Sequence, residues 1–135
     1  MIRLSPEARV FVGERHLATL TTVRPDGTPH VVPVAFTWDA EAGVARITTM
    51  RRAVKARNIE AAVAAHGHAR VAICQVHGGR WLTLEGTARV VDDDAEVAEA
   101  VRRYAVRYRP LDPEPERVVV RVAVDRVLGS DYMVG

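Results

Sequence analysis

The sequence has one cysteine, no long hydrophobic run and almost no excess of charge. Cys74 is the only thiol in 135 residues, so an internal disulfide framework is excluded and a cytoplasmic location is expected. No charged-then-apolar leader opens the chain, and no apolar run approaches the ~20 residues that a membrane span needs. We therefore expect no membrane association.

The charges nearly cancel. Lys plus Arg number 19 and Asp plus Glu number 17, which gives a formal net charge of +2. This excess is too small to indicate a nucleic-acid partner. A local basic pocket for an anionic small molecule fits the composition better.

Common catalytic motifs are also missing. The sequence contains no CxxC, no HExxH, no Walker loop and no GxGxxG between a strand and a helix. His66 and His68 flank Gly67 without a third metal ligand nearby, so no metal site is expected. If the protein is an enzyme, a bound cofactor supplies the chemistry and the chain supplies orientation and electrostatics.

Hydrophobic periodicity predicts one domain over residues 1–135, with antiparallel strands in a small barrel and two or three flanking helices. Helices are expected after the Ser5 cap to about Glu14, over residues 54–65 and after residues 92–94. The expected strands cover residues 17–23, 30–38, 44–49, 70–76, 80–91 and 117–124.

Two strands carry unusual faces. In residues 30–38, Val31 and Pro33 belong to a small, smooth face that could lie against a flat ring or be covered by another element, and Pro33 suggests an edge strand. In residues 80–91, Trp81 falls on the polar face. We interpret it as a dimer contact, a ligand contact or an exposed aromatic without a role.

The chain is organised around residues 48–58, where a strand ends in Thr48 and Thr49, turns through Arg51 and enters a helix. Strand-end hydroxyls, free N–H groups at a helix start and nearby cations together can hold a phosphate. Lys55 and Asn58 are three residues apart, so they share one helical face. The alternative is a solvated basic turn.

Four segments resemble the split-barrel flavin and deazaflavin proteins of the pyridoxamine-phosphate-oxidase-like fold. These segments are residues 16–22, 26–34, 55–58 and 80–86. Within that superfamily the sequence is most similar to the actinobacterial branch that uses the deazaflavin coenzyme F420, in particular its biliverdin reductases. The match covers nearly the whole chain, although Met50, Arg51 and Arg52 stand where the relatives are glycine-rich.

The resemblance implies a homodimer with a cofactor in each cleft between subunits. By position, the implied cofactor site has a wall beside the ring, a phosphate end, and a turn that reaches the partner's cofactor. Its residues are His30, Val31, Val32, Pro33, Val34, Thr48, Thr49, Arg51, Lys55, Asn58, Arg80 and Trp81.

The implied reaction is hydride transfer from C5 of reduced F420 to a planar conjugated acceptor, for biliverdin the central methine bridge, giving bilirubin. No side chain forms a covalent bond, and Arg51 and Arg80 are candidates for holding substrate carboxylates or assisting proton transfer. Two alternatives remain open. One is the same fold reducing a quinone or an unsaturated lactone, or using FMN. The other is a non-catalytic flavin-, F420- or haem-related binding protein.

Overall fold

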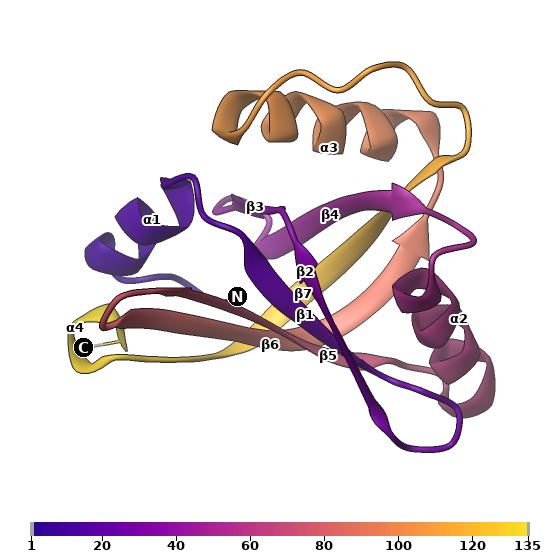
Figure 1. Cartoon of the computed structure of the whole chain (residues 1–135), viewed down its shortest axis with the longest axis horizontal. Coiled ribbons are helices and arrows are strands. Elements are labelled where there is room, and N and C mark those ends of the chain that lie inside the picture. The colour runs from indigo at the N-terminus through magenta and orange to yellow at the C-terminus, as the bar shows by residue number, and fades with distance from the viewer. Residues whose placement is uncertain (1, 135) are drawn as a thin grey trace.

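The computed structural model describes residues 2–134, apart from the side chain of Tyr132 (Figure 1). The elements are α1 (Pro6–Gly13), β1 (Ala18–Val23), β2 (Pro29–Val34), β3 (Phe36–Asp39), β4 (Val44–Met50), α2 (Val54–His66), β5 (Arg70–His77), β6 (Arg80–Val91), α3 (Asp94–Arg107), β7 (Arg117–Gly129) and α4 (Asp131–Val134). No helix in this part of the chain is long and apolar enough to cross a membrane.

The strands form one antiparallel sheet in the order β2-β1-β5-β6-β7-β4-β3. β2 and β3 are the two edges of this sheet, yet only Ala35 separates them in the chain. The sheet therefore curls on itself, which confirms the split barrel. The expected single strand over residues 30–38 was wrong, because the chain changes partners at Ala35 from β1 to β4.

Helices close both ends of the barrel. α1 and α4 lie together at one end, where the Ser5 hydroxyl donates to the Met133 carbonyl, and α2 lies at the opposite end (Figure 1). Phe11 of α1, Ile59 of α2 and Met133 of α4 join the same apolar core as the inward side chains of the strands. α2 ends where Gly67 adopts φ 80°, a left-handed conformation that glycine adopts readily.

α3 packs on the outer face of β3, β4 and β7 rather than at an end (Figure 1). The Asp93 carboxylate caps its first turn, as expected for the acidic run before it. The guanidinium of Arg46 in β4 contacts Asp39 at 2.7 Å and Glu96 of α3 at 2.6 Å. The pair with Asp39 is buried within the sheet, and the pair with Glu96 joins α3 to it.

β7 is longer than the sequence predicted, because it continues past residue 124 to Gly129. A bulge between Glu85 and Gly86 shifts the register of β6, and the strand then pairs with residues 126–129. A Cβ at Gly86 would lie 2.2 Å from the Ala123 carbonyl oxygen, so only glycine fits there.

Candidate functional site

The chain enters α2 through the basic turn that follows β4. Thr49 lies on the barrel side of β4 with Ile47, whereas Thr48 lies on the side that α3 covers. Ala53 is the N-cap of α2 and offers no side-chain cap, and no acidic residue lies in the first turn. The positive end of the helix dipole and its first N–H groups are therefore available to an anion.

Lys55 lies in that first turn of α2. Its side chain is half-buried, and this burial lowers the pKa of the ammonium group. Within residues 2–134 it has no ion pair and no side-chain hydrogen bond. A cation that has lost part of its hydration without gaining a carboxylate is suited to receive a phosphate or carboxylate ligand.

Arg51 is engaged elsewhere. Its guanidinium contacts Glu60 of α2 at 2.8 Å and Asp92 after β6 at 2.6 Å. All three side chains are substantially exposed, so these pairs contribute little stability, but they orient the turn. In the single chain Arg51 thus acts as a clamp between α2 and the end of β6.

Asn58 points into the protein. Its side-chain amide donates to the Thr22 hydroxyl at 3.0 Å, and the residue is only 6% exposed. Thr22 is in turn the cross-strand neighbour of His30 in β2, whose Nδ1 is buried without a hydrogen-bond partner in the described part of the chain. β1, β2 and α2 therefore meet at Thr22, and Asn58 fixes α2 there.

β2 presents the two faces that the alternation predicted. Val32 and Val34 point toward the core, and Val31 and Pro33 point outward. β2 is an edge strand, as Pro33 suggested. No helix is packed on this outer side in the described structure, so the smooth face is open to a ligand or a partner.

Arg80 and Trp81 lie at the other end of the sheet. Trp81 is ten residues before Val91 along β6, which is about 33 Å of strand, and Val91 lies beside the end of β4 that carries Thr49. Arg80 contacts both carboxylate oxygens of Glu14, at 2.9 and 3.1 Å. Within one chain these two residues therefore lie at the end of the sheet away from α2.

The sequence did not reveal how Glu14 and its neighbours are arranged. The bonds from Arg80 and from His16 lower the pKa of the Glu14 carboxyl to about 2. His16 also stacks on His77, with ring centroids 4.3 Å apart. This cluster joins the end of α1 to the β5–β6 turn, and only the folded chain brings its members together.

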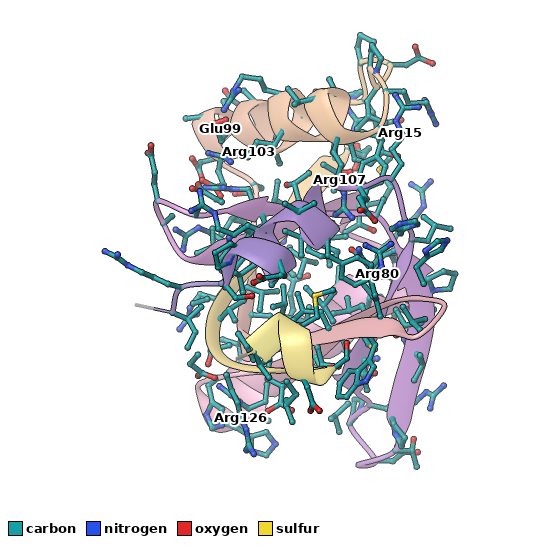
Figure 2. All side chains as sticks on the ribbon, turned by 90° about the vertical axis from the view of Figure 1, so that its left-hand side faces the viewer. Arg15, Arg80, Glu99, Arg103, Arg107 and Arg126 are labelled. Carbon is teal, nitrogen blue, oxygen red and sulfur yellow. The ribbon has the colours of Figure 1, made fainter. Side chains whose placement is uncertain are left out.

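The sequence also did not reveal the environment of Arg107, at the end of α3. It is buried, and its guanidinium donates to the carbonyl oxygens of Phe36 and Glu14 and to Gln75 Oε1 at 2.5, 2.8 and 2.8 Å. Figure 2 shows it beneath α3, between the helix and the barrel. The spacing of Ala100, Tyr104 and Arg107 on one helical face was the available signal.

Taken together, these residues can bind and orient an anionic, planar molecule. One end offers a free cation and a helix N-terminus, and the adjoining edge strand offers a smooth apolar wall. Residues 2–134 contain no group of three or more His, Cys, Asp or Glu that could hold a metal ion. The arrangement fits a phosphate-bearing ring cofactor.

Comparison with known proteins agrees with this geometry. The family model described as pyridoxamine 5'-phosphate oxidase matches residues 4–131. This chain belongs to the pyridoxamine 5'-phosphate oxidase family. The resemblance read from the sequence is thereby confirmed.

Three proteins show which members of the pyridoxamine 5'-phosphate oxidase family this chain is similar to. An F420H(2)-dependent biliverdin reductase from Mycobacterium tuberculosis (strain CDC 1551 / Oshkosh) is 48% identical over 128 residues, covering 95% of this chain and 89% of that protein. A solved F420 reductase is 27% identical, with a TM-score of 0.70 over 89% of this chain and 94% of its own. HupZ of Group A Streptococcus, 19% identical with a TM-score of 0.74 over 100% and 98% of the two chains, shares the fold.

Proposed function

We propose that this protein is an F420-dependent oxidoreductase that reduces a planar conjugated acceptor, with biliverdin as the substrate. The observation that carries the proposal is the 48% identity to an F420H(2)-dependent biliverdin reductase across 95% of the chain. The F420 reductase among the structural neighbours supports the same cofactor. Reduced F420 supplies the hydride, and the chain holds and orients the reactants.

In this proposal the α2 end of the barrel holds the cofactor. Lys55 and the first N–H groups of α2 bind the phosphate, with Thr49 as an additional hydroxyl donor. The strand from His30 to Val34 forms the wall beside the ring, where Val31 and Pro33 offer a flat apolar surface. Asn58 positions α2 through Thr22, and Arg51 orients the turn through its two carboxylate partners.

We also propose that the working unit is a homodimer. Among residues 2–134, no helix covers the outer face of β2, β1, β5 and β6. The strand register places the exposed Leu17, Val76 and Trp81 side by side on this face. A second copy would cover these apolar side chains and bring its own Arg80 and Trp81 toward the cofactor of the first copy.

A substitution in that apolar row tests the dimer. Val76→Glu places a charge at its centre, whereas Val10→Glu makes the same change on α1, where the side chain is equally exposed at 65% against 61%. Burying an unpaired charge costs about 2–5 kcal/mol, so we expect Val76→Glu to weaken dimerisation about 30-fold or more in analytical ultracentrifugation. The homodimer proposal would be wrong if the wild type were monomeric, or if both variants dimerised with equal affinity.

Activity is tested by mixing the protein anaerobically with reduced F420 and biliverdin. We expect oxidised F420 and bilirubin to form together, in equal amounts and faster than without protein. A quinone and an unsaturated lactone serve as alternative acceptors. If biliverdin gives no rate above the protein-free reaction, the substrate assignment is wrong, and a faster reaction with another acceptor would identify the better class.

The last part of the proposal concerns the cellular location of the protein. We propose that the protein works in the cytoplasm of an actinobacterium, a proposal that the single cysteine and the mycobacterial relative support.

A further inference from the structure

A hollow lies away from the α2 end, between α1, β3 and α3. It has a volume of about 370 Å³, which is within the range of small-molecule sites. Four arginines line it, and no acidic side chain does: Arg9 from α1, and Arg102, Arg103 and Arg107 from α3. We call this hollow the α1–α3 groove. Figure 2 shows Arg103 and Arg107 beneath α3, facing the rest of the molecule.

Two buried polar atoms on the walls of the α1–α3 groove have no hydrogen-bond partner within residues 2–134. They are the hydroxyl oxygen of Thr37, a residue only 5% exposed, and Nε of Arg103, whose carboxylate neighbour Glu99 lies at 3.6 Å, beyond hydrogen-bond distance. Thr37 is paired with Arg46, so both point toward α3. A buried polar group without a partner costs about 1–3 kcal/mol, which indicates that something else satisfies these atoms.

The positive charge of the groove is poorly compensated. Arg103 lies 3.3 Å from Asp39 and 3.6 Å from Glu99, both longer than the contacts of Arg46 beneath the same helix. Arg107 is bonded only to neutral oxygens among the described residues, and Arg9 has no ion pair there. Arg102 shares Glu99 with Arg103. The lining therefore carries more positive charge than the nearby carboxylates neutralise.

We propose that the α1–α3 groove binds a small polyanion that bears carboxylate or phosphate groups. Arg9 and Arg103 hold its oxygens, the Thr37 hydroxyl donates to it, and Trp38 forms the adjoining wall. The groove lies on the outer side of β3, whereas the proposed cofactor end involves α2 and β2. The proposal therefore stands independently of F420 binding.

The two tryptophans provide the test, because Trp38 lines the groove and Trp81 lies on the uncovered sheet face. Their indole N–H signals are followed by NMR while pyrophosphate or citrate is added at constant ionic strength, with chloride as the reference salt. The signals are assigned with Trp81→Phe. We expect a saturable shift of the Trp38 signal with a Kd of about 1 mM or tighter, and a constant Trp81 signal. Whichever anion gives the response identifies the ligand as phosphate- or carboxylate-bearing.

Matched variants complete the experiment. Within residues 2–134 the exposed Arg9 has no ion pair and the Thr37 hydroxyl has no hydrogen-bond partner, so Arg9→Gln and Thr37→Val should both fold. Each should weaken anion binding at least tenfold and leave F420 affinity unchanged. Arg57→Gln, on the exposed side of α2, should change neither. No saturable Trp38 shift with either anion, or equal affinity in Arg9→Gln and wild type, would overturn the proposal.

Discussion

Replacing Lys55 by methionine separates cofactor binding from stability. Methionine keeps an unbranched apolar stem and removes only the ammonium group. In the free protein that group is half-buried, has a pKa lowered by burial and has no ion pair within residues 2–134. Its removal should therefore leave the free energy of unfolding unchanged or slightly higher.

The same substitution should weaken F420 binding strongly. A charge-assisted hydrogen bond to a phosphate contributes about 1.5–3 kcal/mol, which corresponds to a roughly 10- to 150-fold higher Kd. Affinity in the wild type should also fall as the pH rises through the lowered pKa of Lys55, because only the ammonium form attracts the anion. Lys55→Met should lose this pH dependence.

Fluorescence titration of F420 and urea unfolding measure the two effects. Arg57→Met is the matched control, because it removes an exposed cation two residues away on the same helix. Its Kd should stay within about twofold of wild type, since exposed charges at this distance are screened. Unchanged F420 affinity in Lys55→Met, or equal losses in both variants, would refute the assignment of Lys55 as the phosphate anchor.

Two further predictions concern the fold. Gly86→Ala places a Cβ 2.2 Å from the Ala123 carbonyl oxygen and should lower the free energy of unfolding in urea by about 3 kcal/mol. In the control Gly13→Ala, the new Cβ has no heavy atom within 4 Å, so stability should be nearly unchanged. Equal stability of the two variants would contradict the close packing of the bulge. Glu14 has a folded pKa of about 2 against 4.5, so its stabilisation is complete above pH 4.5 and is lost as the pH falls toward 2. Unfolding measured from pH 5 to pH 2.5 should therefore depend less steeply on pH in Glu14→Gln, and identical slopes would show that the Arg80 contact is not formed in solution.

The sequence predicted most elements because local signals and tertiary structure agree in them. β6 has the predicted bounds, and α2 ends at its glycine. The break at Ala35 was missed because Val32, Val34 and Phe36 all point inward, so the alternation continues while the neighbouring strand changes. The extension of β7 was missed because a bulge is set by pairing with another strand, which periodicity does not report.

The candidate site was predicted less completely. Lys55 could be singled out because a cation at a helix start can bind an anion, and in the structure it lies in the first turn of α2. Asn58 lies on the buried side of the same helix and is bonded to Thr22. It is three residues after Lys55, so its side chain points about 60° away from that of Lys55, toward the barrel. The partners of Arg51, Arg80 and Arg107 come from distant segments, so no local pattern could indicate them.

A parallel titration of the purified protein with F420 and with FMN, followed by cofactor fluorescence, tests the central claim most directly. The account predicts saturable binding of F420 with a Kd at least about tenfold lower than that of FMN, a difference of about 1.4 kcal/mol. Preferential binding of FMN, or no binding of F420, would contradict the claim that this family member is an F420-dependent reductase.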